Sequence, residues 1–360
     1  MSPVILAAPA AFKGTLGPRQ VAAALAQGIH RAAPQATVLQ CPISDGGDGL
    51  LDAVLAPEAR REALPVSGPL GESVTGELGW VDGETAIFES ATACGLRLLR
   101  PEERDPLRAT TRGVGELIWE AAERGAKTVV VGLGGSATVD GGSGAARALG
   151  WTLRDPAGAP LPEGGAALGR LAEVAGGWGL AARVVALADV TTPLAGAEGA
   201  AVVFGPQKGA GPEAVKLLAR GLERLSEVMA RHGRPELAAL PGGGAAGGLG
   251  AGLVFFAKAH LVAGAEWVLA RVGFDAALAR ADLVITGEGS FDRTSLVGKA
   301  SGEVVRRAQV AKKPVAIVAG KVDGLAGLHA LDGEGRMLDA AGIAGLGERA
   351  VRQAFGLPTP

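Results

Sequence analysis

Short apolar runs alternate with longer amphipathic stretches from the beginning of the chain. Residues 4–8 form an apolar run that predicts a buried strand, and residues 18–32 have the apolar spacing of a helix, with Pro18 suited to its first turn. A second strand pattern follows at residues 37–43. This β-α-β order predicts a parallel sheet, and open α/β sheets bind ligands at the carboxyl edge of their strands.

The pattern changes in the middle of the chain. Within residues 65–89, two extended runs flank the dipeptide Asp82-Gly83, which predicts an antiparallel hairpin. Patterns of buried strands return at residues 282–287 and 315–319. We therefore expect two α/β domains. Residues 1–64 and 281–360 would form a Rossmann-like domain with a parallel sheet, interrupted by an inserted mixed α/β domain of residues 65–280.

A glycine-rich stretch, VVVGLGGSATVDGGSG at residues 129–144, has the order of a strand, a loop and an alanine-rich helix. A strand that ends in glycines leaves backbone N–H groups free, and the helix directs its positive end to the same place, so an anionic ligand is expected. The stretch has neither the Lys-Ser/Thr ending of a P-loop nor the GxGxxG spacing of a dinucleotide site. A simple turn that binds nothing is the alternative.

Composition and charge narrow the classes of partner. The chain has 360 residues, of which 48% are hydrophobic, and a formal charge of -2. Without a basic excess, a small molecule is favoured over nucleic acid or an anionic membrane. Cys41 and Cys94 lie far apart, which argues against structural zinc and disulfides and favours a reducing, cytoplasmic location. From the N-terminal pattern and the length of the apolar runs, we expect neither a signal peptide nor a transmembrane segment.

Charged residues follow several of the predicted strands, next to the glycine-rich stretches. They are Lys13, Asp45, Asp48, Asp189, Glu288 and Asp292. Phosphoryl transfer uses such groups, because carboxylates hold Mg²⁺ or accept the proton of the attacking hydroxyl while lysines and N–H groups neutralise the phosphoryl group. Each of these residues also has an alternative role that involves no ligand. The lysine could be solvated in a loop and the aspartates could form turns, and Asp140 in the glycine-rich stretch could cap a helix. None of the four histidines lies in a glycine loop, which argues against a Ser-His-Asp hydrolase.

Taken together, these motifs resemble the type-1 glycerate kinase family. The resemblance extends over nearly the whole chain in the family's order and is carried by APAAFKGTL (8–16), SDGGDG (44–49), GLGGSATVDGGSG (132–144), ADVTTPLAG (188–196), FGPQKGA (204–210), PGGGAAGGLGAG (241–252) and ITGEGSFDRTSLVGK (285–299). The first motif departs from the family pattern, because Ala10 and Ala11 stand where an Asp-Ser pair is usual. Any ligand contact of that pair is lost.

The resemblance implies that the chain transfers the γ-phosphoryl group of ATP, with Mg²⁺, to a hydroxyl of D-glycerate. The usual position is O2, which gives 2-phosphoglycerate, and the active site would lie in the cleft between the two domains. Motif position and chemistry together suggest a role for each site residue. Asp189 would be the general base with Asp45 as the second candidate, Lys13 and Lys299 would neutralise phosphate or carboxylate, Gly134, Gly135, Ser136 and Lys208 would bind phosphate, and Glu288 and Asp292 would hold Mg²⁺.

Other functions stay open at this point. The kinase could act at O3 or on another small hydroxy acid, or the chain could be a non-catalytic sugar-acid-binding protein of the same fold. A dinucleotide-dependent oxidoreductase is disfavoured, because the first predicted strand lacks the GxGxxG motif. Homodimer formation also stays open.

Overall fold

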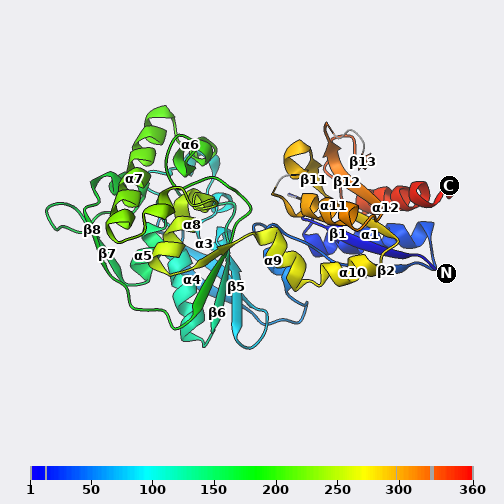
Figure 1. Cartoon of the computed structure of the whole chain (residues 1–360), viewed down its shortest axis with the longest axis horizontal. Helices are drawn as coiled ribbons and strands as arrows, with labels where there is room; N and C mark the ends of the chain where they lie inside the picture. The colour runs from blue at the N-terminus through cyan, green and yellow to red at the C-terminus, as the bar shows by residue number, and fades with distance from the viewer. Residues whose placement is uncertain (1, 13, 297, 325–327, 359–360) are drawn as a thin grey trace. The chain divides into compact units, whose positions relative to one another are not determined.

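The structure consists of two compact units (Figure 1). The computed structural model describes residues 2–12, 14–296, 298–324 and 328–358. Unit 1 comprises Met1–Asp45, Gly49–Val54 and Gly264–Pro360, and unit 2 comprises Gly46–Asp48 and Leu55–Ala263. The division between the units falls after residues 54 and 263, whereas the expected boundaries lay after residues 64 and 280. Residues 264–280 belong to unit 1 because α9 (Gly264–Arg271) and α10 (Phe274–Arg280) pack against its sheet.

Unit 1 contains an all-parallel sheet with the strand order β13-β12-β11-β1-β2. Its strands are β1 (Val4–Pro9), β2 (Thr37–Gln40), β11 (Leu283–Phe291), β12 (Val315–Val322) and β13 (His329–Asp332). From β1 the chain first adds β2 on one side and later builds β11, β12 and β13 on the other. This is the strand order of flavodoxin-like sheets, whose topological switch point lies between the two strands that correspond to β1 and β11.

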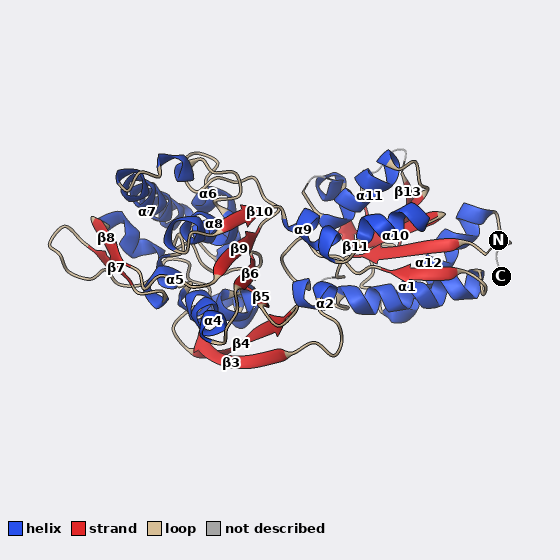
Figure 2. Ribbon diagram, turned by 60° about the horizontal axis from the view of Figure 1, so that its bottom comes forward, coloured by secondary structure: helices blue, strands red, loops and turns tan. Residues whose placement is uncertain are grey.

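Helices cover both faces of this sheet (Figure 2). They are α1 (Pro18–Ala32), α2 (Leu50–Val54), α9 (Gly264–Arg271), α10 (Phe274–Arg280), α11 (Ala300–Val310) and α12 (Ala340–Phe355). Because side chains alternate along a strand, Ile5 and Ala7 pack with α1 and α12, whereas Leu6 and Ala8 pack with α9, α10 and α11. This two-faced burial explains why β1 is apolar at every position.

Two strands of unit 1 differ in length from the sequence prediction. β2 ends at Gln40. β11 does not end at Gly287 but continues to Phe291, because β12 pairs with it beyond Gly287, at Glu288, Ser290 and Phe291, and the side chain of Phe291 is fully buried. Glu288 therefore lies within a strand, and the prediction that it follows the strand is wrong.

Unit 2 contains a mixed sheet with the order β10-β9-β6-β5-β4-β3. Its strands are β3 (Arg61–Ser67), β4 (Ser73–Trp80), β5 (Thr85–Glu89), β6 (Thr128–Gly132), β9 (Arg183–Leu187) and β10 (His260–Val262), and a separate hairpin consists of β7 (Trp151–Arg154) and β8 (Glu173–Gly176). The predicted hairpin is confirmed as the antiparallel pair β4–β5. Asp82 holds its turn by accepting hydrogen bonds from the N–H groups of Glu84 (2.9 Å) and Thr85 (2.7 Å). The predicted fold class, with one parallel and one mixed sheet, is confirmed.

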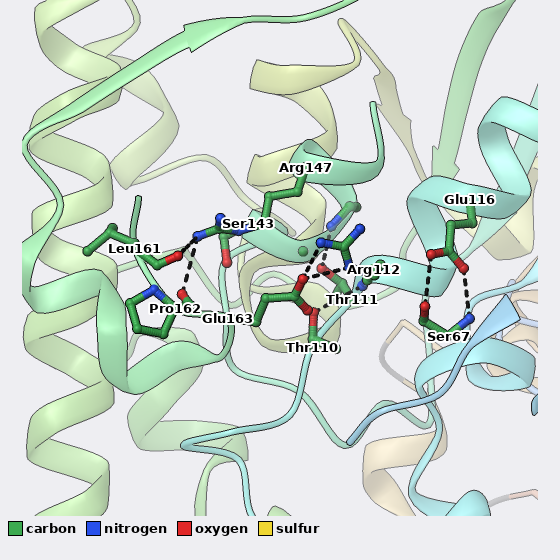
Figure 3. A network of polar contacts seen from close by, with 12 residues as sticks. Ser67, Thr110, Thr111, Arg112, Glu116, Ser143, Arg147, Leu161, Pro162 and Glu163 are labelled. Atoms are coloured by element: carbon green, nitrogen blue, oxygen red, sulfur yellow. Dashed lines mark hydrogen bonds and ion pairs between the residues drawn. The ribbon is translucent and has the colours of Figure 1, made fainter. Parts of the chain in front are cut away.

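The helices of unit 2 pack in two layers on one face of the mixed sheet. They are α3 (Ala91–Cys94), α4 (Arg112–Glu123), α5 (Ser143–Ala148), α6 (Ala200–Phe204), α7 (Pro212–Arg231) and α8 (Ala245–Phe256). α8 lies between two cores, because Leu249 and Leu253 face the sheet and Ala251 faces α7. Glu116 on α4 accepts hydrogen bonds from the N–H (2.7 Å) and hydroxyl (2.8 Å) of Ser67 at the end of β3 (Figure 3). Within the described ranges, no helix combines the length and apolar character needed to cross a bilayer.

Candidate active site

The glycine-rich loop of unit 2 begins where β6 ends. β6 and β9 are neighbouring parallel strands, with Gly132 paired to Leu187 and the N–H of Leu133 donating to the carbonyl of Leu187 (3.0 Å). Their carboxyl ends therefore lie at the same edge of the sheet. Gly134 follows one strand and the half-buried Asp189 follows the other, so the structure brings these two predicted site residues to one edge.

Three consecutive backbone donors in this loop find no acceptor among the described residues. Within the described ranges, the N–H groups of Gly134, Gly135 and Ser136 have no hydrogen-bond partner. The loop is nevertheless held in place, because the carbonyl of Gly135 accepts from Leu96 N–H (2.8 Å) and Ala137 N–H donates to the carbonyl of Cys94 (2.7 Å). Successive free N–H groups in a fixed loop form an anion-binding concavity. The geometry thus fits the predicted phosphate role of these three residues.

The second half of the SDGGDG motif packs against this loop within unit 2. A Cβ atom at Gly134 would lie only 3.0 Å from the Cα atom of Gly47, and one at Gly135 would lie 3.4 Å from Asp48 Oδ1. The close backbone approach explains why position 134 favours glycine. Asp48 Oδ1 is also 3.8 Å from Nη1 of Arg97. Two motifs that are about 90 residues apart in sequence therefore meet at this edge of the sheet.

The loop is also anchored by Asp140, which is fully buried. Its carboxylate accepts hydrogen bonds from the N–H (3.0 Å) and hydroxyl (2.9 Å) of Thr111 and from the N–H groups of Gly142 and Gly144 (both 3.1 Å). Burial raises the pKa of Asp140, and the hydrogen bonds from Thr111, Gly144 and Gly142 oppose that rise. The predicted loop or helix-cap role of Asp140 is confirmed, since Gly142 and Gly144 lie at the start of α5.

The segment that carries Thr111 is itself fixed by ion pairs and hydrogen bonds (Figure 3). The Nε of the neighbouring Arg112 donates to Glu163 Oε1 (2.6 Å), and Nη2 of Arg147 on α5 donates to the carbonyl of Leu161 (2.8 Å). These contacts tie α4 and α5 to the connection that follows β7. The principal hydrogen-bond donor to Asp140 is therefore held in a defined position.

Lys208 lies behind the loop. Its side chain is 3% exposed, and its amine donates to the hydroxyl of Ser136 (2.8 Å) and the carbonyl of Thr138 (2.7 Å). Burial lowers the pKa of Lys208 to about 8, and the negative charge of Asp140 opposes that change. The amine thus orients the hydroxyl of Ser136, whereas its predicted contact with phosphate stays a prediction.

The buried amine predicts a pH dependence of stability. Because the pKa of Lys208 is about 8 in the folded protein and 10.5 is its ordinary value, the unfolded chain binds more protons between these pH values. The free energy of unfolding therefore receives a contribution that rises with pH in this window. Lys208→Met should remove this rise. Urea titrations of both proteins at roughly pH 7, 8, 9 and 10 measure the free energy of unfolding across the window in which proton linkage acts. The exposed Lys216→Met is the control, and equal slopes for wild type and Lys208→Met would contradict the assignment.

Unit 1 has its own group of predicted site residues. The amine of Lys299 lies 3.3 Å from Glu288 Oε2 and 3.1 Å from the hydroxyl of Ser295. Burial raises the pKa of Glu288, the charge of Lys299 opposes the rise, and the carboxylate of Asp45 adds to it. The structure therefore brings Asp45, Glu288 and Lys299 into one electrostatic cluster, while Lys13 lies outside the described residues.

The predicted Mg²⁺ ligands differ in how well they suit a cation. Glu288 Oε1 is buried and has no hydrogen-bond partner in the described part of the chain, so this carboxylate retains an unsatisfied acceptor. Asp292 Oδ1 accepts from the hydroxyl (2.6 Å) and N–H (2.7 Å) of Thr294 and from Ser295 N–H (3.2 Å), and these bonds lower the pKa of Asp292. Among the described residues, no three His, Cys, Asp or Glu side chains gather into a metal site. Glu288 fits a cation better than Asp292 does.

A cavity of about 400 Å³ opens in unit 1 beside Glu288. It lies at the carboxyl ends of β1, β11 and β12, and charged residues contribute much of its wall: Glu288, Lys299, Lys321 and Arg336. Ala11 also lines it, so the departure from the usual Asp-Ser pair faces this cavity. Lys321 was not among the predicted site residues, although it follows the apolar run 315–319, as the other charged candidates follow predicted strands. Arg336 had no comparable signal.

Comparison with known proteins agrees with this picture. A sequence model of the glycerate kinase family matches residues 5–340. The chain belongs to the glycerate kinase family. It is 40% identical over 349 residues to the glycerate 2-kinase of Escherichia coli K12, covering 94% of this chain and 91% of that one. It is also 38% identical over 324 residues to a glycerate kinase of Halalkalibacterium halodurans, covering 88% and 85%.

A solved crystal structure has the same fold as this chain. The crystal structure of a Salmonella typhimurium LT2 protein provisionally named glycerate kinase 2 superimposes with a TM-score of 0.85 at 36% identity, covering 99% of each chain. The resemblance predicted from the motifs is therefore confirmed at the level of the family and the fold. The roles of the individual site residues stay predictions.

Proposed function

We propose that this member of the glycerate kinase family transfers the γ-phosphoryl group of ATP to O2 of D-glycerate, giving 2-phosphoglycerate. The observation that carries the proposal is the 40% identity, over 94% of the chain, to a protein named glycerate 2-kinase. The free N–H groups and the clustered charges described above are the groups that phosphoryl transfer uses. A cytoplasmic location is part of the same proposal.

In this proposal the loop after β6 binds phosphate. The N–H groups of Gly134, Gly135 and Ser136 would each donate to a phosphate oxygen, with Lys208 holding the hydroxyl of Ser136 in position. Because the loop is fixed before the ligand arrives, the donors need no rearrangement as charge develops on the phosphoryl group. Support comes from the free N–H groups and from the anchoring of the loop by Asp140.

We assign the proton transfer to Asp189, with Asp45 as the second candidate. Asp189 follows β9 at the sheet edge that carries the phosphate-binding loop, and it is half-buried, so a substrate hydroxyl can reach its carboxylate. The base would take the proton of the attacking O2 hydroxyl as the bond to phosphorus forms. Lys13 and Lys299 would neutralise phosphate or the glycerate carboxylate.

Mg²⁺ is part of the proposal through the residues that would hold it. Proteins usually bind Mg²⁺ with one or two carboxylates together with substrate phosphates, and the ion neutralises charge between the phosphates. Glu288 suits this role because one of its oxygens is unsatisfied. Asp292 would need to act through water or to give up its hydrogen bonds to Thr294.

A coupled assay for ADP tests the proposed function. The purified protein should release ADP with D-glycerate and Mg-ATP, and other small hydroxy acids should be poorer substrates. Release of ADP only with another hydroxy acid would change the substrate. Saturable binding of D-glycerate without any ADP would favour a non-catalytic sugar-acid-binding protein, and no ADP with any acid would exclude the kinase.

A further inference from the structure

The cavity of unit 1 lies at the topological switch point of its sheet. The chain leaves β1 towards α1, which packs on one face, and leaves β11 towards α11, which packs on the other. The two connections diverge there, and open α/β sheets bind their ligands in the crevice that results. Ala11 and Thr15 line the cavity from the first connection, and Glu288 and Ser290 line it from the end of β11.

The charges on the wall of this cavity favour an anion. Three cations, on Lys299, Lys321 and Arg336, face one carboxylate, on Glu288. Lys299 already pairs with Glu288 at 3.3 Å, so its charge is largely balanced. The charges of Lys321 and Arg336 are therefore the excess that an anionic ligand would meet.

Neither of these two cations forms a strong ion pair with another described residue. In the described part of the chain, the side-chain amine of Lys321 forms no hydrogen bond or ion pair, and only its backbone pairs, with β11. Arg336 pairs with Glu334 at 2.7 Å, but both side chains are 74% exposed, and exposed ion pairs contribute little free energy. Both residues can thus turn to a ligand at small cost.

We propose that Lys321 and Arg336 bind an oxyanion of a substrate in this cavity. The inference rests on the proposed function, which offers two such ligands: the carboxylate of D-glycerate and the phosphate groups of ATP. A volume of about 400 Å³ is within the range of small-molecule sites and accommodates either group. Lys321 lies near the end of β12 and Arg336 in the loop after β13, both outside the sequence motifs, so they are additional binding residues of unit 1.

Calorimetric titrations of the full chain with each ligand separately test this assignment. The ligands are D-glycerate alone and a non-hydrolysable ATP analogue with Mg²⁺. The double variant Lys321→Ala/Arg336→Ala should bind at least one of them about tenfold more weakly or worse, because two charge-assisted contacts are lost. The ligand whose affinity falls in the variant identifies the source of the oxyanion. The Kd of that ligand for the wild type should rise with ionic strength.

A matched double variant controls for net charge. Arg280→Ala/Lys313→Ala also removes two cations from unit 1, but these residues precede β11 and β12 and so lie at the opposite edge of the sheet. It should bind both ligands as the wild type does, and thermal melting should show that both double variants are folded. Wild-type affinity of Lys321→Ala/Arg336→Ala for both ligands would overturn the inference.

The inference and the proposed function can fail separately. If the wild type releases ADP while the cavity variant keeps wild-type Kd and KM values, the inference fails and the kinase stands. If the wild type releases no ADP, the proposed function fails, and the titrations still decide the inference. Absence of binding of either ligand to the wild type would overturn the inference as well.

Discussion

Replacing Asp189 with asparagine is expected to lower kcat by about 10²-fold or more while the protein stays folded, given the usual size of general-base effects. Asparagine keeps the size and hydrogen-bonding capacity of the side chain but cannot take the proton of the substrate hydroxyl. Because Asp189 lies beyond the end of β9 and outside the buried core, the substitution should leave the free energy of unfolding nearly unchanged. Steady-state ADP release and a urea titration measure the two effects.

Asp45→Asn is the comparison that decides which of the two carboxylates is the base. If Asp189→Asn turns over at near the wild-type rate and Asp45→Asn does not, the role of base moves to Asp45. If both variants are slow, the affinity of each for D-glycerate separates a lost base from a lost binding contact. Near-normal turnover of both would remove a carboxylate base from the mechanism.

Replacing Asp140 with alanine is expected to destabilise unit 2 by roughly 3–5 kcal/mol and to abolish most of the activity, because several buried donors lose their acceptor. The N–H groups of Thr111, Gly142 and Gly144 would all be left without a partner in the protein interior. The loop that these bonds shape carries the proposed phosphate donors. Urea titration measures the loss of stability, and the ADP assay, in conditions where the variant is folded, measures the loss of activity.

Asp155→Ala is the matched control for this experiment. Asp155 also accepts hydrogen bonds from two backbone N–H groups, those of Ala157 and Ala159 (both 3.0 Å), but in an exposed turn where water can replace it. Its loss should cost about 1 kcal/mol or less. An equal effect of the two substitutions would contradict the view that Asp140 anchors the loop through buried bonds.

Local patterns predicted the elements whose signal lies within the segment itself. The helix expected at residues 18–32 is α1 (Pro18–Ala32), because one apolar face and a proline in the first turn specify it without help from other segments. The β4–β5 hairpin was predicted for the same reason, since Asp82 and Gly83 determine the turn locally. β11 was predicted too short because its last residues become a strand only through pairing with β12.

No local sequence pattern decides on which side of the loop Lys208 lies. Its burial depends on how residues 206–208 pack against the segment 136–138, which no local pattern records. The glycine-rich stretch 241–252 has a similar explanation. A Cβ atom at Gly247 would lie 1.9 Å from the carbonyl oxygen of Thr138, so glycine there reflects close packing of α8 against the loop. Motif order identified the family, but contacts between distant segments determine the roles of single residues.

The most direct test of the central proposal is to identify the product formed from D-glycerate and ATP by phosphorus NMR without proton decoupling. Phosphate on O2 is attached to a carbon with one hydrogen, so the product resonance should be a doublet that appears as ATP is converted to ADP. Phosphate on O3 is attached to a carbon with two hydrogens and would give a triplet. The account predicts the doublet; a triplet would contradict the O2 assignment, and no new phosphate ester would contradict the kinase.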